Sequence, residues 1–230
     1  MCSSDLLERL ATDRPVVFYD QLGAGRSDRP TDITLWRVDR FIDELADAAN
    51  RDPLEFRLAM LGHQPRHTQV LRLAAEKAGW GKSLPEGRAR GIAVVHCFGG
   101  WTAEVAEVSI ENGQPRVHRV VCAVDCGRAV NPEGVVRQME SSIIYALSAA
   151  LYGKITFSEG AVVQGNFDDY PVLRMNETPE IEVHIVDSEE VPGGVGEPGT
   201  PTAAPAVANA LFALTGKRIQ SLPLSDHEFG

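Results

Sequence analysis

The spacing of apolar residues changes along the chain and divides it into three regions. In the first, the apolar run "RPVVFYD" (14–20) precedes a segment rich in Gly, Asp and Pro, which is typical of a buried strand and a turn. From residue 38 to residue 80 the apolar positions follow a helical period. From residue 90 onward, segments in which apolar and polar positions alternate, which indicates strands, are interspersed with helical segments. We therefore expect a helical segment that leads into a region of mixed helices and strands.

The helical region predicts three helices, over residues 38–50, 52–61 and 67–80. Asp52 is a candidate N-cap for the second helix, because its side-chain oxygens can accept from the free N–H groups of the first turn. Pro53 occupies the first helical position, where an N–H is not needed. Both residues fit the start of a helix.

The alternating region predicts strands over 90–98, 102–110, 116–125 and 180–187. "ENGQP" (111–115) contains Asn-Gly and predicts a hairpin turn, and 153–167 predicts a second hairpin. Two further helices are expected over 132–151 and 200–216, the last ending at Gly216. Because helices alternate with antiparallel hairpins and regular βαβ units are not apparent, we expect an α+β fold.

Three parts are expected along the chain: 1–40 without a complete domain, a helical segment at 41–84, and an α+β sandwich at 85–230. The formal charge of −10 argues against nucleic acid or an anionic membrane as the main partner. No apolar run reaches transmembrane length, and no signal peptide is visible at the N-terminus. The compartment, cytoplasm or periplasm, stays open.

The four cysteines are expected to be free thiols. Cys122 and Cys126 lie in "RVVCAVDCG", which has a strand pattern, and four residues of a strand span about 13 Å. A disulfide needs Cα atoms within roughly 7 Å. The spacing of Cys and His residues does not suggest a metal site. Asp125, just before Cys126, is typical of a turn.

The segment "VPGGVGEPGTPTAAP" (191–205) places one carboxylate, Glu197, between Gly196 and Pro198. Glycine lets a backbone approach a ligand closely, and proline stiffens the loop. Glu197 is either a reactive carboxylate on a rigid loop or a carboxylate that the dipole of the following helix favours. The residues alone leave both possibilities open.

From about residue 41 to the C-terminus, the chain resembles the molybdenum hydroxylase superfamily of xanthine dehydrogenase and aldehyde oxidase. The resemblance is to the C-terminal part of a large subunit of the isoquinoline 1-oxidoreductase type. The segments that carry it are "FIDELADAANRDPLEFRLAML", "RGIAVVHCFGGWTAEVAEVSI", "VHRVVCAVDCGRAVNPEGVVRQME", "FDDYPVLRMNETPEIEVHIV" and "GGVGEPGTPTAAPAVANALFALTGKRI". In that superfamily GVGEP followed by a helix is the catalytic loop.

The resemblance implies a C-terminal molybdopterin-binding domain and an oxidoreductase activity. It implies a molybdopterin cofactor, possibly in a cytosine dinucleotide form, whose metal-bound hydroxide attacks an N-heteroaromatic or aldehyde carbon while a hydride passes to a sulfido ligand. Glu197 matches the glutamate that acts as general base. Which small-molecule substrate is used cannot be derived from these residues.

The resemblance also implies that Gln138, Val195 and Gly196 contact the cofactor. Gln138 matches a glutamine that hydrogen-bonds the molybdenum end, with a solvent-facing helix residue as the alternative. Val195 and Gly196 match loop backbone near the metal. The chain departs from the family at Ser141 and Ser142, where glycines are usual, so the fit of the cofactor is in doubt there.

Large subunits of this family are several times longer, and their upstream part supplies the other half of the cofactor cradle. We therefore expect the isolated chain to be inactive. The resemblance implies an iron–sulfur small subunit as partner, and this chain has no cysteine pattern for such clusters. A folded module without catalysis is the alternative.

Residues 7–40 resemble a different family, the proline iminopeptidases, which are α/β-hydrolases. The segment is "LLERLATDRPVVFYDQLGAGRSDRPTDITLWRVDRFIDEL". The chain has no G-x-S-x-G nucleophile elbow and no triad downstream, which excludes a serine peptidase. We interpret the reading frame as a chimera of two coding sequences joined near "FIDELA" (41–46), with a natural gene fusion as the alternative.

Overall fold

The computed structural model of the chain describes residues 38–219 and 221–229. The resemblance at 7–40 lies outside the described residues, except for its last three. From Asp39 onward the chain forms one compact unit.

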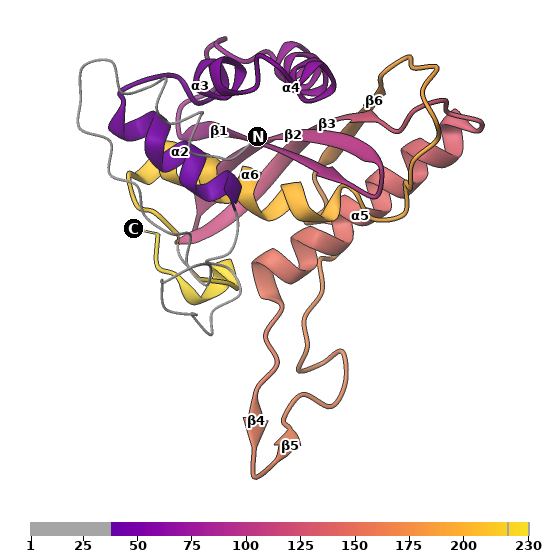
Figure 1. Cartoon of the computed structure of the whole chain (residues 1–230). Coiled ribbons are helices and arrows are strands. Elements are labelled where there is room, and N and C mark those ends of the chain that lie inside the picture. Colours follow the sequence, from indigo (N-terminus) through magenta and orange to yellow (C-terminus); the bar gives the residue numbers. More distant parts are fainter. Residues whose placement is uncertain (1–37, 220, 230) are drawn as a thin grey trace, which may run out of the picture. The chain divides into compact units, whose positions relative to one another are not determined.

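A four-stranded sheet forms the centre of this unit, in the order β1-β2-β3-β6 (Figure 1). Its strands are β1 (Arg88–Cys97), β2 (Gly100–Glu111), β3 (Gln114–Asp125) and β6 (Glu180–Ile185). The first three are antiparallel neighbours. Asn112 and Gly113 join β2 to β3 with φ values of 53° and 75°, as a two-residue hairpin turn requires. The predicted Asn-Gly hairpin is confirmed.

Strand β6 differs from the expected arrangement, because it pairs parallel to β3, from Arg119↔Glu180 to Val124↔Ile185. The long helix α5 (Pro132–Tyr152) lies between these two strands in the sequence. Parallel neighbours need such a crossover to bring the chain back to the same end of the sheet. The sequence analysis, which found no regular βαβ units, did not anticipate this single crossover at β3-α5-β6. Alternation revealed the strand but not its direction.

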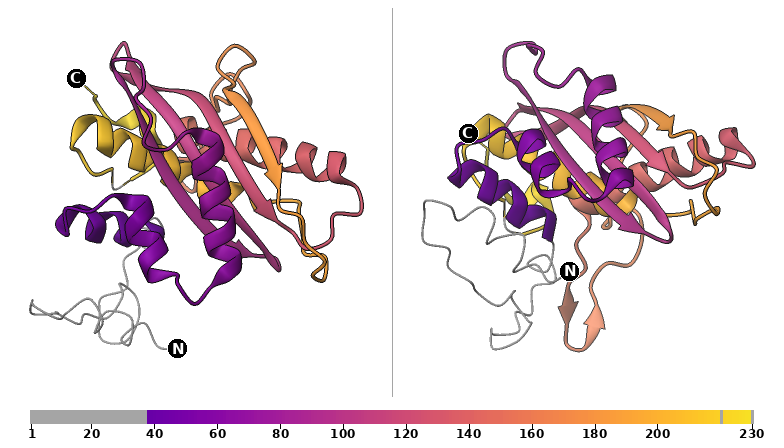
Figure 2. Two further views of the ribbon diagram at one scale, coloured as in Figure 1. Left: turned by 90° about the horizontal axis from the view of Figure 1, so that it is seen from above. Right: turned by 45° about the horizontal axis from the view of Figure 1, so that its top comes forward.

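Helices cover both faces of the sheet (Figures 1 and 2). Helices α3 (Pro53–Met60) and α4 (Pro65–Ala78) lie on one face, and α5 and α6 (Thr200–Thr215) lie on the other. Alternate residues of β2 serve the two cores, since Val105 packs below α4 and Ala106 packs against α5 and α6. The predicted α+β class is confirmed.

Helix α6 crosses β1 so closely that Gly91 cannot carry a side chain. A Cβ atom on Gly91 would lie 2.2 Å from the carbonyl oxygen of Ala206 and 2.2 Å from the backbone nitrogen of Ala210. Asn209 donates from Nδ2 to the Ile92 carbonyl at 3.1 Å. These contacts fix α6, and with it the loop that precedes the helix, on the sheet.

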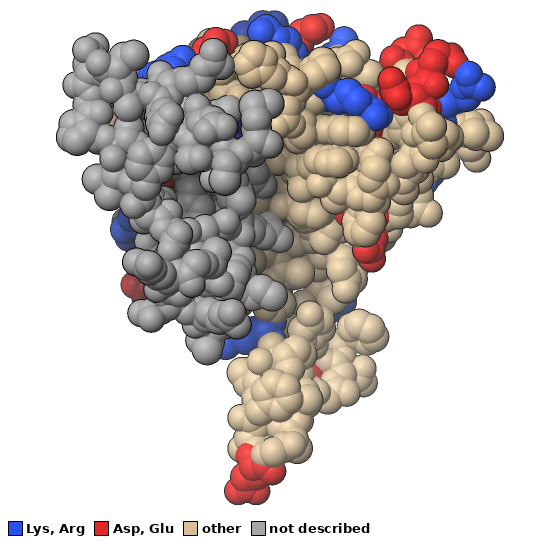
Figure 3. All heavy atoms as spheres, in the orientation of Figure 1, with Lys and Arg blue, Asp and Glu red and all other residues tan. Residues whose placement is uncertain are grey.

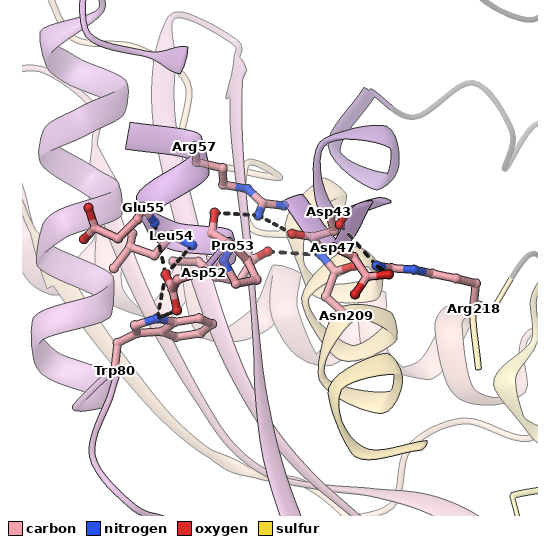
Figure 4. Close-up of polar contacts among 11 residues, drawn as sticks. Asp43, Asp47, Asp52, Pro53, Leu54, Glu55, Arg57, Trp80, Asn209 and Arg218 are labelled. Carbon is pink, nitrogen blue, oxygen red and sulfur yellow. Dashed lines mark hydrogen bonds and ion pairs between the residues drawn. The ribbon is translucent and has the colours of Figure 1, made fainter. Parts of the chain in front are cut away.

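Asp52 caps α3 as predicted. Its Oδ1 accepts from the N–H groups of Leu54 at 2.9 Å and Glu55 at 3.0 Å. Oδ2 also accepts from Nε1 of Trp80 at 3.0 Å, which ties the helix start to the end of α4 (Figure 4).

A buried ion pair links α2 (Val38–Ala48) to α3. The Arg57 guanidinium donates to Asp43, and both side chains are almost completely buried (Figure 4). Burial raises the pKa of Asp43, although the hydrogen bond and the charge of Arg57 oppose the shift. Arg218, beyond α6, donates to the Asp43 carbonyl at 3.1 Å. The helical segment is thus tied to the C-terminal part of the unit.

The segment 153–167, here called the arm, follows α5 in the sequence and projects away from the sheet as a short hairpin (Figure 1). It contains β4 (Phe157–Ser158) and β5 (Ala161–Val162), at the position of the predicted second hairpin. Figure 3 shows the arm with few charged side chains except at its tip. Several large apolar residues of this segment are exposed: Ile155, Phe157, Val162, Val163 and Phe167.

Three of the cysteines lie in the described residues, and all three are free, as predicted. Cys122 and Cys126 are buried, and Cys97 is half-buried. Among the described helices, none has the length and apolarity to span a membrane. A 3-10 turn, η2 (Leu224–Asp226), lies near the C-terminus.

Candidate functional site

The loop 191–199 is hydrogen-bonded to the ends of three strands. Gly193 donates its N–H to the carbonyl of Cys126 at 2.8 Å, just beyond β3. Gly194 donates to the carbonyl of Phe98 at 2.7 Å, in the turn between β1 and β2. The first half of the loop therefore has a fixed backbone path.

Two glycines allow this close backbone packing. A Cβ atom on Gly193 would lie 2.5 Å from the carbonyl oxygen of Gly99, and one on Gly127 would lie 2.3 Å from that of Val191. Gly127 also has a φ of 72°. Gly196 differs, because a Cβ atom there would meet nothing within 4 Å. The loop is packed at its start and open at Gly196.

Glu197 is exposed, and its carboxylate has no hydrogen bond or ion pair with another described residue. Its carbonyl accepts from the N–H of Thr200 at 2.9 Å, which closes a turn before α6. The following Pro198 and Gly199 are buried. The N-cap of α6 is Gly199, and this helix start has no side-chain capping bond. The Glu197 side chain is thus free to meet a ligand, and it does not cap α6.

Ser142, where the family usually has glycine, packs below the end of the loop. A Cβ atom on Gly199 would lie 2.5 Å from its Oγ. Ser142 donates this hydroxyl to the Met139 carbonyl at 3.0 Å, within α5. The neighbouring Ser141 is exposed. The hydroxyl of Ser142 is therefore part of the contact between α5 and the loop end.

Gln138 is exposed on α5, one helical turn before Ser142 and so on the same side of the helix. No hydrogen bond joins it to Glu197, and no other described residue partners its amide. Val195 is half-buried and packs against the core below α5 and α6, so its side chain anchors the loop. Gln138 thus lies on α5, and Glu197 lies on the loop that packs against α5. The two side chains do not contact each other.

An ion pair that the sequence did not predict supports the same region. Arg66, in α4, donates to both carboxylate oxygens of Asp125, at 2.5 and 2.6 Å. Burial would raise the pKa of Asp125, but the hydrogen bonds from Arg66 and from the N–H of Gly127 outweigh it, so the pKa is lowered. The bond to Gly127 at 3.1 Å confirms the predicted turn role of Asp125. The partner Arg66 lies 59 residues away, so no local pattern could indicate it.

Aromatic rings extend this contact toward the turn between β1 and β2. The Arg66 guanidinium lies 3.7 Å from the centre of the Trp101 ring, and His96 stacks on the same ring at 4.1 Å. Trp101 donates from Nε1 to Nδ1 of His67 at 2.9 Å. These side chains hold the β1–β2 turn that supports Gly194.

Glu104 is a second carboxylate that the sequence analysis missed. It is 0% exposed in the middle of β2, and neither carboxylate oxygen has a hydrogen-bond partner of good geometry among the described residues. Burial raises the pKa of Glu104 to about 8, although a polar contact with Thr202 opposes the shift. An acidic residue at a core-facing position of "TAEVAEVSI" was the available signal.

No cluster of three or more potential metal ligands occurs in the described residues.

Comparison with known proteins separates the two resemblances. A proline iminopeptidase of Heyndrickxia coagulans is 57% identical over 60 residues, which cover 25% of this chain and 19% of that protein. The resemblance to that family is thus confirmed for a short part of the chain only.

The rest of the chain matches molybdenum enzymes. Isoquinoline 1-oxidoreductase subunit beta of Brevundimonas diminuta is 37% identical over 188 residues, which cover 80% of this chain. The chain spans about a quarter of that relative's length (24%). The aldehyde oxidoreductase of Desulfovibrio gigas shares the fold, with a TM-score of 0.61, 12% identity, and coverage of 84% of this chain and 39% of its own.

The family model for the molybdopterin cofactor-binding domain matches residues 42–179. These residues include Glu104 and Gln138 and end just before β6, so Glu197 lies outside the matched range. The match covers the sheet strands β1 to β3 and helix α5. The chain therefore belongs to the molybdopterin cofactor-binding domain family.

Proposed function

We propose that the chain is the C-terminal part of a molybdenum hydroxylase large subunit that oxidises an N-heteroaromatic or an aldehyde, with Glu197 as general base. The observation that carries the proposal is the exposed, unpaired carboxylate of Glu197 on a loop whose first half is fixed to the strand ends. A carboxylate that no cation neutralises is available to accept a proton.

The residues around the loop fit a molybdopterin cofactor. The free space at Gly196 lets a ligand approach the loop backbone, and the exposed amide of Gln138 can donate to an oxygen. Ser141 points to the surface and Ser142 into the core, so the two serines need not collide with a ligand near Gln138. Gln138 and the backbone at Val195 and Gly196 would hold the cofactor, possibly in its cytosine dinucleotide form.

When bound, the cofactor supplies the oxygen-transfer and two-electron chemistry of the reaction. The role of this chain is proton transfer and orientation. An oxygen atom of the Glu197 carboxylate takes the proton of the attacking nucleophile. The hydrogen-bonded backbone at Gly193 and Gly194, a few residues upstream, limits how far this carboxylate can move. Gln138 orients the cofactor from the α5 side.

The complete enzyme needs parts that this chain does not supply. The matched part of the chain spans 24% of the isoquinoline 1-oxidoreductase subunit, so that relative is several times as long. Ligand sites are enclosed by protein on several sides, and this chain supplies only one side of the proposed cofactor site. We propose that the upstream part of the large subunit and an iron–sulfur small subunit complete it, and that the isolated chain does not turn over.

A hybrid enzyme tests this proposal. Residues 41–230 would replace the matching part of the Brevundimonas subunit, co-expressed with its small subunit, and molybdenum content and isoquinoline oxidation would be measured. We expect molybdenum to be incorporated and substrate to be oxidised. In the hybrid, Gln138→Ala should lower molybdenum content severalfold, because one cofactor contact is lost, while Arg137→Ala, an exposed neighbour, should not. A folded hybrid without molybdenum would contradict the proposal and favour a non-catalytic module.

A further inference from the structure

Glu104 lies on the face of the sheet that supports α5 and α6. It alternates with Val105 on β2, and its cross-strand neighbours are Ala93 on β1 and Cys122 on β3, all of them buried. Most of its core neighbours on this face are apolar, and the buried polar side chains there, Thr102 and Thr202, are uncharged, so a carboxyl group is unexpected. Removing a carboxyl group from water is costly unless the group stays neutral or finds a partner.

The Glu104 carboxyl lies directly below the turn that follows Glu197. A Cβ atom on Gly199 would lie 3.2 Å from Oε1 of Glu104 and 2.5 Å from Oγ of Ser142, so the loop packs tightly on both side chains here. Gly199 is the N-cap of α6, two residues after Glu197. A displacement of Glu104 toward the surface would therefore push on the turn that carries Glu197.

The surroundings of Glu104 do not supply a compensating positive charge. Cys122 faces it from β3, Thr202 from α6, and Ser142 lies beside Gly199 on α5. Of these, only Cys122 titrates, and burial and the nearby Glu104 carboxyl raise the pKa of its thiol. Both oxygens of Glu104 lack a hydrogen-bond donor of good geometry among the described residues. The neutral acid suits this site, and the carboxylate does not.

We propose that Glu104 is a positioning residue for Glu197: as a neutral acid it supports the turn at Gly199, and its ionisation displaces the turn. The negative charge needs water, and Gly199, which packs on Oε1 of Glu104, lies two residues from the exposed Glu197. The inference takes from the proposed function only the role of Glu197. Displacement of the turn is a property of this chain and needs no cofactor.

Hydrogen exchange of the full chain tests this inference. Amide exchange in the segment 194–204 would be measured by mass spectrometry at about pH 6 and about pH 9.5 and corrected for intrinsic rates. We expect corrected exchange in the unsubstituted chain to be roughly tenfold faster at the higher pH, because Glu104 is then ionised. Glu104→Gln cannot ionise and should exchange equally slowly at both pH values. Glu111→Gln, an exposed change on the same strand, should behave like the unsubstituted chain.

An equal pH response in the unsubstituted chain and in Glu104→Gln would overturn the inference. If Glu104→Gln does not fold, Glu104→Leu removes the same ionisation with a similar side-chain size and gives the same two outcomes. The result is independent of molybdenum and turnover. An inactive hybrid enzyme would not affect the hydrogen-exchange result. A negative hydrogen-exchange result would not decide whether Glu197 is the general base, which the hybrid enzyme tests separately.

Discussion

Two glutamates near the same turn have opposite surroundings. Glu197 is exposed and has no described partner, so its carboxylate can meet a ligand. Glu104 is fully buried below Gly199, and burial raises its pKa to about 8. In our proposals the exposed group transfers a proton and the buried group supports the turn. Arg66 and Asp125 hold the strand end beside them through a bidentate ion pair.

Glu104 also makes the stability of the chain depend on pH. In the folded chain the Glu104 carboxyl keeps its proton up to about pH 8, whereas in the unfolded chain it loses the proton near pH 4.5. The folded state therefore binds more protons between these values, and stability falls as pH rises, by up to about 1.4 kcal/mol per pH unit. We expect Glu104→Gln to remove this slope, as measured by urea unfolding across the window. A constant difference in free energy between the two chains would contradict the expectation.

At the scale of elements, close helix packing should be more sensitive to substitution than the open loop. Gly91→Ala places a Cβ 2.2 Å from the backbone of α6, so the helix must move away from β1. We expect a loss of about 3 kcal/mol or more, or failure to fold, in thermal unfolding experiments. Gly196→Ala is the matched control, since its Cβ meets nothing within 4 Å. Equal melting temperatures for the two variants would show that α6 is not fixed at Gly91.

The elements that could be predicted from the sequence are those with local causes. The Asn112-Gly113 turn follows from residues that accept positive φ, and the α3 cap follows from Asp52. The parallel direction of β6 depends on the path of α5 and the arm, which alternation does not reveal. The Arg66–Asp125 pair joins residues 59 positions apart, so it too needed the structure.

The candidate site was predictable in a different way. Glu197, Gln138, Val195 and Gly196 came from the family resemblance, and the structure adds their exposure and support. Glu104 was within reach of the sequence, because an acid at a core-facing strand position is unusual. Alternation alone does not show that both faces of β2 are buried, and on a strand with one exposed face Glu104 would face solvent.

At the scale of the whole molecule, the chain combines similarity to two unrelated families. The molybdopterin-binding family covers residues 42–179, and the peptidase similarity covers 25% of the chain. The peptidase-like residues before 38 lie outside the described residues. That two coding sequences were joined near residues 41–46 stays a hypothesis, as does the division into parts at 1–40, 41–84 and 85–230.

The arm leaves apolar surface exposed, and we expect it to cause self-association of the isolated chain. Phe157 and Phe167 are 72% and 68% exposed, and burying an aromatic side chain contributes about 1.5–3 kcal/mol. The double variant Phe157→Ser and Phe167→Ser should weaken association roughly tenfold or more in sedimentation velocity experiments. Glu159→Gln, in the turn between β4 and β5, is the control and should have little effect. An unsubstituted chain that stays monomeric at high concentration would contradict this prediction.

Turnover per molybdenum atom in the hybrid enzyme, with Glu197→Gln, is the decisive measurement. A general base contributes about 10²–10⁴-fold, so the variant should keep its molybdenum and lose at least about a hundredfold in turnover. Glu190→Gln, an exposed change in the preceding loop, should leave turnover unchanged. If Glu197→Gln turns over as fast as the unsubstituted hybrid at equal molybdenum content, Glu197 is not the base.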